Sequence, residues 1–410
     1  MEHAARNYLI VTASYWGFTL VDGALRMLVL FHFFKLGYSP FTLAFLFLLY
    51  ELAGVVANLA GGWLATRFGI PRMLMIGQTL QIIGLGMLSF LDPTWTVAVS
   101  VAWVVIAQGV CGLAKDFTKT ASKSAIKATS AEGSGQLFRW VAWFTGSKNA
   151  MKGAGFFVGG LLLDAVGFKP ALWLMAGLIG TVLLACLLLP RELGKAKASK
   201  SMRELFAKSA GVNLLAAARI FLFGARDVWF VVALPVFLYA NGWRFAEVGG
   251  FLAAWTIGYG FVQAIAPSLV QRSEDGLSRE VPAAWHWSAA LIAIPVALAL
   301  LLQTDTSRPD LWIVAGLALF GLPFAVNSSL HSYLILAYAG SKKAAEDVGF
   351  YYAANAAGRL IGILLSGALY QLGGMTACLF GSAFMLAFCW VITLALPLTP
   401  ESRASVGRTV

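Results

Sequence analysis

The sequence predicts an all-α polytopic membrane protein, with about twelve transmembrane helices in two pseudo-symmetric six-helix bundles. The chain has 410 residues, of which 59% are hydrophobic and 12% are charged, and its mean hydropathy is +0.78. Apolar stretches of roughly 20 residues, each long enough to cross a bilayer as a helix, follow one another along the chain. Length and composition therefore predict the class before any motif is considered.

The apolar stretches predict twelve helices in chain order. We expect them near residues 8–34, 41–66, 72–91, 95–122, 137–163, 170–189, 212–239, 245–270, 283–302, 310–338, 346–371 and 375–398. The first stretch is longer than the apolar part of a signal peptide and has no small-residue cleavage site, so we expect a retained helix.

One long polar stretch, basic and poor in aromatic residues, separates the sixth and seventh predicted helices. We interpret it, over 191–211, as a cytoplasmic linker between an N-terminal six-helix bundle at 1–190 and a C-terminal six-helix bundle at 212–398. Residues 399–410 then form a cytoplasmic tail. Lysine and arginine cluster in alternate loops, so the positive-inside rule predicts that both termini lie in the cytoplasm.

The two predicted bundles resemble each other faintly. A shift of 205 residues places Phe18 on Phe223, Asp22 on Asp227, Gly37 on Gly242 and Arg67 on Arg272, and a shift of 207 places Lys152 on Arg359, Gly160 on Gly367 and Gly167 on Gly374. Parallel internal repeats of this kind are typical of secondary transporters. The matched ionisable residues favour duplication over chance similarity.

Four lysines follow an apolar stretch at a strict four-residue interval: Lys115, Lys119, Lys123 and Lys127. A helix turns about 400° over four residues, so their ammonium groups are expected along one face. We expect Lys123 and Lys127 to reach the membrane surface on their long stems. Two interpretations stay open for Lys115 and Lys119, which either pair with Asp116 or attract an anion from the cytoplasm.

Ionisable side chains also lie deep within the predicted helices. The cations are Arg26, Lys115, Lys119, Lys148, Lys152, Arg219, Arg226 and Arg359, and the acids are Asp22, Glu51, Asp116 and Asp227. A central charge that faces lipid costs about 2.5–3.5 kcal/mol, and the net stability of a whole domain is about 5–15 kcal/mol. Most of these groups must therefore line an aqueous cavity or pair with one another.

The excess of positive groups predicts a binding site for an anion. Lys148 and Lys152 lie one turn apart on a shared face, and Arg359 is the repeat counterpart of Lys152. The candidate substrate ligands are Lys115, Lys119, Lys148, Lys152, Arg226, Arg359, Asn355 and His331. For His331, a role as an ordinary core histidine is the alternative.

Acidic residues near these cations are candidates for ion pairing or for coupling to protons, because nearby cations shift the pKa of a carboxylate. They are Asp22, Glu51, Asp116 and Asp227, together with Arg26 as a basic partner. Asp22 and Arg26 stand four residues apart, so a structural pair on one helix face is one interpretation.

The stretch GGWLATRFGIPRML, at 61–74, resembles the loop signature of the major facilitator superfamily. Gly62, Arg67, Gly69 and Arg72 fit that signature, whereas Thr66 replaces its usual acidic residue. The resemblance implies the major facilitator fold, with a cytoplasmic latch that here lacks its carboxylate.

Within that superfamily, the stretch GLAKDFTKTASKSAIK, at 112–127, resembles the corresponding segment of the ArsJ organoarsenical efflux permeases. The resemblance extends along the chain and implies a bacterial inner-membrane exporter that confers arsenate resistance by alternating access. The implied cargo is 1-arseno-3-phosphoglycerate, which forms when arsenate replaces phosphate in the glyceraldehyde-3-phosphate dehydrogenase reaction. That dehydrogenase is then the functional partner that supplies the cargo, and we expect the transporter to be a monomer surrounded by membrane lipid.

Other classes of function lack their usual signals. The sequence has no G-x-x-x-x-G-K-[ST] motif, so we expect secondary transport without nucleotide hydrolysis. It has no H-E-x-x-H or G-x-S-x-G motif, which argues against an enzyme. Four isolated cysteines lack zinc-site spacing, so we expect neither a metal nor a cofactor. The net charge of +11 lies largely in loops, which disfavours binding to nucleic acid.

Two transport alternatives remain open. An exchanger of another phosphate ester or organic anion would carry the same cations. A proton-coupled drug exporter is the second alternative, although the excess of buried positive charge disfavours hydrophobic cargo.

Overall fold

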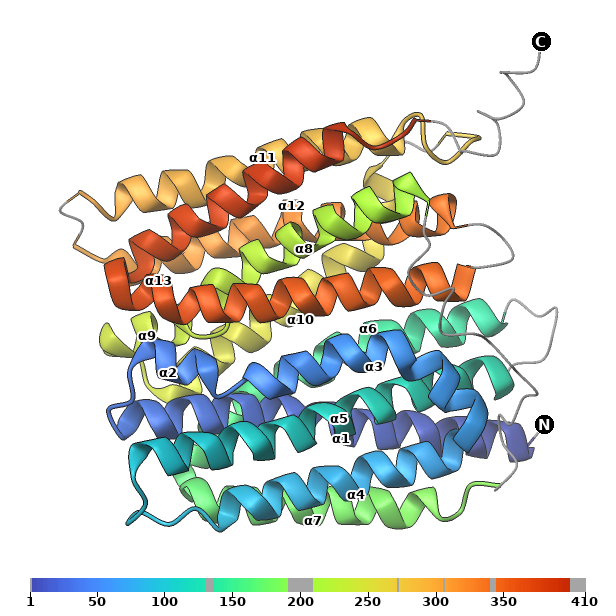
Figure 1. Ribbon diagram of the computed structural model, residues 1–410, viewed down its shortest axis with the longest axis vertical. Coiled ribbons are helices and arrows are strands. Elements are labelled where there is room, and N and C mark those ends of the chain that lie inside the picture. The colour runs from blue at the N-terminus through green and yellow to red at the C-terminus, as the bar shows by residue number, and fades with distance from the viewer. Residues whose placement is uncertain are drawn as a thin grey trace. The chain divides into compact units, whose positions relative to one another are not determined.

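The computed structural model consists of helices joined by turns and loops in the residues it describes, which are 2–129, 136–190, 209–270, 273–304, 307–339 and 344–398. Side chains within 2–5, 60–68, 123–129, 136–146, 267 and 344–346 lie outside the described part. No strand occurs in the described ranges, so the all-α prediction is confirmed (Figure 1).

The chain divides into two compact units. Unit 1 comprises Met1–Lys200 with Gly242–Ile257, and unit 2 comprises Ser201–Asn241 with Gly258–Val410. Unit 1 contains α1 (Glu2–Lys35), α2 (Pro40–Phe45), α3 (Leu48–Phe68), α4 (Ile70–Ser89), α5 (Val97–Thr129), α6 (Gln136–Ala165) and α7 (Phe168–Cys186). Unit 2 contains α8 (Ala210–Phe230), α9 (Ala233–Ala240), α11 (Glu280–Leu301), α12 (Pro309–Tyr338) and α13 (Ala344–Leu394), and α10 (Phe245–Leu269) is divided between the units.

Nine stretches of helix in the described part of the chain are long and apolar enough to cross a membrane. They include α1, α5, α7, α10, α11 and α12 in whole or part, the joined α2–α3 and α8–α9, and α13. The more polar α4 and α6 have comparable lengths, and α13 breaks at Gly373 and Gly374, where the backbone leaves helical geometry. Counting α4, α6 and the two parts of α13 separately gives the twelve expected crossings.

Two of the predicted helices are interrupted. The expected helix at 41–66 is broken at 46–47 between α2 and α3, and the one at 212–239 is broken at 231–232 between α8 and α9. The second break has a local cause, because the ring of Pro235 clashes with the carbonyl of residue 231 and provides no N–H for it. The hydroxyl of Ser366 on α13 accepts a 3.0 Å hydrogen bond from the Ala233 N–H at the restart.

Glycines allow α1 and α6 to approach closely in unit 1. A Cβ added at Gly155 on α6 would collide with the carbonyl of Leu20 on α1, and one at Gly23 would lie 2.7 Å from the carbonyl of Lys152. The backbones are therefore in direct contact, which brings the charged residues of α1 near those of α6.

The corresponding helices of unit 2, α8 and α13, meet in the same way. A Cβ at Gly362, which the 207-residue shift places on Gly155, would lie 2.5 Å from the carbonyl of Gly224. Matched junction glycines also share a left-handed backbone: Gly37 and Gly242 have φ of 82° and 90°, and Gly167 and Gly374 have φ of 83° and 62°. These equivalent conformations agree with the internal repeat inferred from the sequence.

Candidate functional site

A buried ion pair joins α1 to α3 in unit 1. A terminal nitrogen of Arg26 lies 2.5 Å from Oε1 of Glu51, and the two side chains are 5% and 1% exposed. The guanidinium also lies over the rings of Phe47 and Tyr50, with its carbon 5.1 and 4.9 Å from their centroids. Arg26 therefore pairs with Glu51, and the expected pair between Arg26 and Asp22 four residues earlier is not formed.

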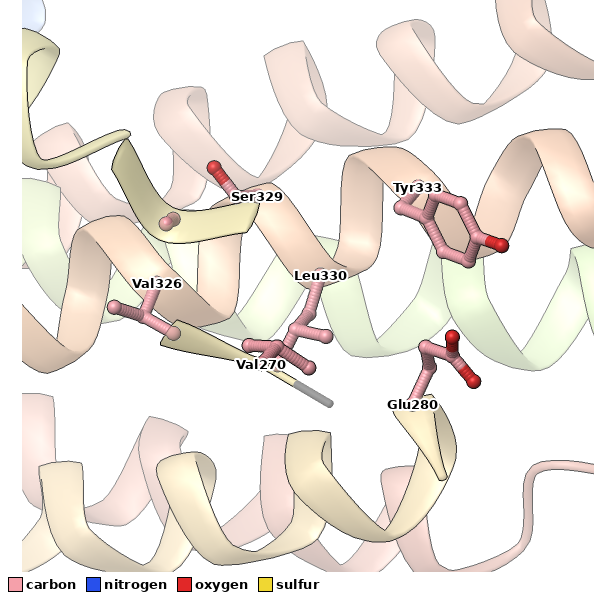
Figure 2. Close-up of a pocket in the computed structure, with 7 residues that line it drawn as sticks. Val270, Glu280, Val326, Ser329, Leu330 and Tyr333 are labelled. Carbon is pink, nitrogen blue, oxygen red and sulfur yellow. The ribbon is translucent and has the colours of Figure 1, made fainter. Parts of the chain in front are cut away.

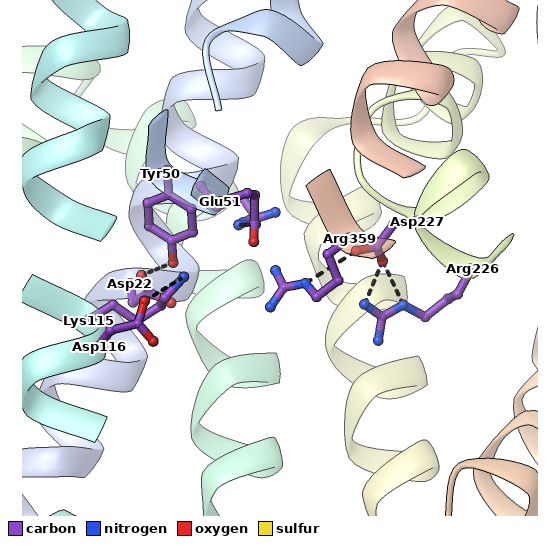
Figure 3. A network of polar contacts seen from close by, with 9 residues as sticks. Asp22, Tyr50, Glu51, Lys115, Asp116, Arg226, Asp227 and Arg359 are labelled. Atoms are coloured by element: carbon purple, nitrogen blue, oxygen red, sulfur yellow. Dashed lines mark hydrogen bonds and ion pairs between the residues drawn. The ribbon is translucent and has the colours of Figure 1, made fainter. Parts of the chain in front are cut away.

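Tyr50 on α3 connects charged residues of α1 and α5 (Figure 3). Its hydroxyl donates a hydrogen bond to Asp22 on α1, and the ammonium of Lys115 on α5 lies 3.8 Å from its ring centroid. Asp22 is thus a buried carboxylate that accepts a hydrogen bond from a neutral hydroxyl. This central role was not predicted, because a tyrosine in an apolar stretch usually reads as part of the core or an interface anchor.

The first two lysines of the four-residue series already have acidic neighbours. The ammonium groups of Lys115 and Lys119 lie 3.9 and 3.6 Å from the carboxylate of Asp116, and Lys119 donates a 3.0 Å hydrogen bond to Asn58 on α3. The pairing with Asp116 is therefore present, whereas attraction of an anion from the cytoplasm stays a prediction for these lysines, whose side chains are 16% and 22% exposed. The side chains of Lys123 and Lys127 lie outside the described residues.

The cluster of Asp22, Arg26, Glu51, Lys115, Asp116 and Lys119, which we call the unit 1 network, is formally neutral, with three cations and three acids. Lys148 and Lys152 on α6 are half-buried and add two further positive charges to this unit. The Lys152 ammonium lies 5.7 Å from the ring centroid of Phe156. Of the deep charges identified from the sequence in this unit, the two that lie outside the unit 1 network are therefore both on α6.

Asp227 on α8 lies between two arginines in unit 2 (Figure 3). Arg226 donates to Oδ1 of Asp227 from Nε at 2.7 Å and from a terminal nitrogen at 2.5 Å, and Nε of Arg359 on α13 donates to Oδ2 at 3.3 Å. The carboxylate is fully buried, whereas the arginine side chains are 14% and 18% exposed. The two guanidinium groups thus share the carboxylate of Asp227.

Aromatic rings surround Arg226. Its guanidinium carbon lies 4.9 Å from the ring centroid of Phe223 and 5.6 Å from those of Phe230 and Phe324. The ring faces stabilise a cation while offering no acceptor that would compete with an incoming anion. Together with the fork geometry of guanidinium, this arrangement suits an oxyanion such as a phosphate or a carboxylate.

Arg219, also on α8, is buried without a carboxylate in the described part of the chain. Its Nε donates to Oδ1 of Asn355 at 2.9 Å, and a terminal nitrogen donates to the Ser328 carbonyl at 3.1 Å. Only 4% of Arg219 is exposed. The sequence identified Arg219 as a deep charge but did not include it among the substrate ligands, because nothing in the sequence distinguishes a paired arginine from an unpaired one.

His331 lies on the same face of α12 as Ser328, one turn away. Its imidazole is fully buried, and neither ring nitrogen has a hydrogen-bond partner among the described residues. A buried histidine of a well-packed core normally has such a partner. The structure therefore places His331 and Asn355, both predicted ligands, beside Arg219.

The loop signature lies at the junction of α3 and α4. Gly69 has a positive φ of 75° and precedes the first residue of α4, so its lack of a side chain allows the turn between α3 and α4. Arg72 is exposed on the first turn of α4, and Gly62 lies within α3. The side chain of Arg67 lies outside the described residues.

A separate pocket opens between α10, α11 and α12 of unit 2 (Figure 2). It has about 370 Å³ of empty space, part of it open to solvent, and its lining is Ala266, Val270, Glu280, Val326, Ser329, Leu330 and Tyr333. The Glu280 carboxylate already accepts hydrogen bonds from the backbone N–H and hydroxyl of Ser273, at 2.9 and 2.5 Å. This mostly apolar pocket contains none of the predicted ligands and does not suit an anion.

Comparisons with known proteins agree with the helical architecture. The chain matches the Major Facilitator Superfamily over residues 8–293. No curated protein matches it. Many solved structures do, among them a POT family transporter in complex with a thioalcohol-conjugated peptide, with 15% identity, a TM-score of 0.71 and 95% of each chain covered.

Two further solved structures are similar. A POT family transporter in complex with 5-aminolevulinic acid has 15% identity and a TM-score of 0.72, again with 95% of each chain covered. A structure described as giving insight into substrate recognition in proton-dependent oligopeptide transporters has 13% identity, a TM-score of 0.68, and 96% of this chain and 98% of that chain covered. At such low identity these likenesses concern the fold, and the family match covers well over half of the sequence. The chain therefore belongs to the Major Facilitator Superfamily and is a multi-pass membrane transporter.

Proposed function

We propose that this transporter exports a small, multiply charged organic anion, and that its cargo is the arsenate ester 1-arseno-3-phosphoglycerate. The observation that carries the anionic part of the proposal is the arrangement of arginines in unit 2. Arg226 and Arg359 both donate to the carboxylate of Asp227, and Arg219 has only neutral hydrogen-bond partners among the described residues. Removing a charge from water costs several kcal/mol even after relaxation. An anionic cargo would supply the missing counter-charge each time it binds.

Lysines of unit 1 support the same substrate class. Lys148 and Lys152 stand one turn apart on α6 and are half-buried, so they are accessible to a polar cargo. A peptide or amino acid, as found in the similar POT family structures, carries an ammonium as well as a carboxylate. The surplus of fixed cations in unit 2 favours a cargo whose charges are all negative.

Asp227 suggests how binding is coupled to an energy source. Its two oxygens occupy the guanidinium edges that a substrate oxyanion would use. Substrate must therefore displace Asp227, and protonation of the carboxylate would make that displacement easier. Exchange with protons or with a second anion follows naturally from this competition. Asp22 and Glu51, which lie in the neutral unit 1 network, are the other candidate proton carriers.

The arsenate part of the cargo rests on the likeness of the segment at 112–127 to the ArsJ permeases. The cargo carries an arsenate, a phosphate and a hydroxyl on three carbons, which agrees with a site built from lysine and arginine. We propose glyceraldehyde-3-phosphate dehydrogenase as its cytoplasmic source, and a bacterial inner membrane, with both chain termini in the cytoplasm, as its location. The alternative is an exchanger of another phosphate ester, which would use the same charged residues.

Inverted membrane vesicles provide the test. The vesicles are incubated with glyceraldehyde-3-phosphate dehydrogenase, glyceraldehyde 3-phosphate, NAD and arsenate, and vesicular arsenic is measured while each component is omitted in turn. We expect accumulation only with the complete mixture. Arsenic uptake that persists without the dehydrogenase would reject the ester as cargo, and uptake of phosphate esters alone would favour the alternative exchanger.

Site variants connect the transport to the arginines and lysines. Lys152→Gln and Arg359→Gln should each abolish uptake while the protein still inserts into the membrane in normal amounts. The control is Arg244→Gln, because Arg244 is 80% exposed and pairs only with the nearby Glu247 among the described residues. Normal uptake by both site variants would place the substrate site elsewhere.

A further inference from the structure

Two arginines of α8 contact the ring of the same aromatic residue. The guanidinium carbon of Arg219 lies 3.9 Å from the ring centroid of Phe223, and that of Arg226 lies 4.9 Å from the same centroid. The two guanidinium carbons are therefore no farther apart than the sum of these distances. Seven residues separate Arg219 from Arg226, which places both on one face of α8, about two turns apart.

The surroundings of the two arginines differ in charge. Arg226 shares a buried carboxylate, Asp227, with Arg359. The described contacts of Arg219 are instead neutral: the amide oxygen of Asn355, the carbonyl of Ser328 and two ring faces, those of Phe223 and Tyr351.

Arg219 has more N–H donors than the hydrogen bonds seen for it in the described part of the chain. Guanidinium carries five N–H donors, and only two hydrogen bonds from Arg219 are seen in the described part of the chain. A second unsatisfied group lies one turn from the Ser328 carbonyl that Arg219 contacts: the fully buried His331, whose ring nitrogens lack hydrogen-bond partners in the described ranges. Each unmade hydrogen bond of a buried polar group costs about 1–3 kcal/mol. A polar ligand that hydrogen-bonds to Arg219 and His331 would remove this cost.

We propose that Arg219, His331 and Asn355 form a second oxyanion subsite, which binds the far charged group of a substrate whose near group binds at Arg226 and Arg359. This inference rests on the proposed function and assigns the two anionic groups of that small cargo to two separate subsites. Phe223 lies between the subsites and packs against the uncharged carbons that connect the two groups. Arg219 thus distinguishes anions with two charged groups from anions with one, a distinction that the Arg226 subsite alone cannot make.

Residues of α13 also fix the separation of the two subsites. Asn355 and Arg359 stand four residues apart and so share a face of α13, one in each subsite. Between them, Gly358 packs directly against the backbone of Ile220 on α8, where a Cβ would collide with the carbonyl oxygen. This close contact between helices sets a fixed distance between the two positive sites, which a flexible loop could not do.

The test compares two stable probes that differ in one charged group. The wild-type full-length protein, purified in detergent, is titrated with 3-phosphoglycerate, which carries a phosphate and a carboxylate, and with glycerol 3-phosphate, which carries the phosphate alone. We expect Arg219→Gln to weaken binding of 3-phosphoglycerate at least about tenfold, in line with the loss of a charge-assisted hydrogen bond. Binding of glycerol 3-phosphate should change by less than about twofold in the same variant.

Two further variants guard against simple misfolding. His331→Phe removes no charge and should also weaken binding of 3-phosphoglycerate selectively. Arg226→Gln should weaken both probes, because the phosphate of each binds at that subsite. Elution as a single symmetric peak in gel filtration checks that each variant is folded.

The outcomes separate the two proposals. If the wild-type protein binds both probes and Arg219→Gln weakens both equally or neither, the second subsite is rejected while the anion transporter stands. If the wild-type protein binds neither probe, the proposed function fails and the subsite fails with it. Selective loss of 3-phosphoglycerate binding in both Arg219→Gln and His331→Phe would establish the second subsite.

Discussion

The ion pair between Arg26 and Glu51 yields the sharpest prediction for stability. Glu51→Gln preserves the shape of the side chain and removes its charge, which leaves the Arg26 guanidinium buried without its counter-ion. The two side chains are 5% and 1% exposed, so little water can compensate. Breaking a buried pair by removing one partner costs about 3–5 kcal/mol.

The expected loss can be expressed as a melting temperature. For a folding unit of 150–250 residues, roughly the size of unit 1, each kcal/mol lowers the melting temperature by about 2–4 °C. We therefore expect Glu51→Gln to lower it by at least about 6 °C. Tryptophan fluorescence of the detergent-purified full-length protein during heating measures this change.

Two comparisons make the result decisive. Glu247→Gln removes the acid of an exposed pair with Arg244, where the side chains are 46% and 80% exposed, so we expect no resolvable change. The double variant Arg26→Met with Glu51→Leu removes both charges and should recover most of the lost stability. If Glu51→Gln melts as Glu247→Gln does, or if the double variant is the least stable, the buried pair does not stabilise unit 1 as we reason.

Three further predictions concern single contacts. Asp227→Asn should raise the affinity for glycerol 3-phosphate about tenfold in a titration, because it removes the carboxylate that competes for two guanidinium groups. Uptake of the cargo into vesicles should fall in the same variant. Weaker binding of glycerol 3-phosphate would mean that Asp227 mainly positions the arginines. Tyr50→Phe leaves the buried Asp22 carboxylate without its hydroxyl donor and should lower stability by about 1–3 kcal/mol in a denaturant titration, whereas an unchanged midpoint would contradict the hydrogen bond. Gly155→Leu should lower the melting temperature strongly, because its Cβ would collide with α1. Gly177→Leu should leave the melting temperature unchanged, because the space around Gly177 is open. Equal melting temperatures for the two variants would argue against the close contact between α1 and α6.

Most of the fold could be predicted from local properties of the sequence. Apolar length and the polar stretch near 191–211 predicted the helices in order, since a bilayer imposes a minimum length on every crossing. The internal repeat also matched glycines such as Gly37 and Gly242, and both adopt the left-handed backbone that glycine allows. The break between α8 and α9 was missed, although Pro235 was a visible signal for it.

The candidate site was predicted less completely, because pairing between helices depends on side chains far apart in the chain. Asp22 and Arg26 share a helix face, yet their partners are Tyr50 and Glu51 on another helix. In the same way, the sequence identified Arg219 as a deep charge but could not show that it lacks a carboxylate.

By itself, the sequence determined the class of the protein, the order of its helices and the surplus of positive charge within them. These properties follow from composition and spacing, because the cost of placing a charge or an unpaired backbone group in lipid is the same whatever the neighbouring helices are. The tertiary structure alone decided which cations are neutralised. The charge on Arg26 is offset by Glu51, whereas Arg219 is left with neutral partners, since a carboxylate offsets a charge only within a few ångströms and packing between helices sets that distance.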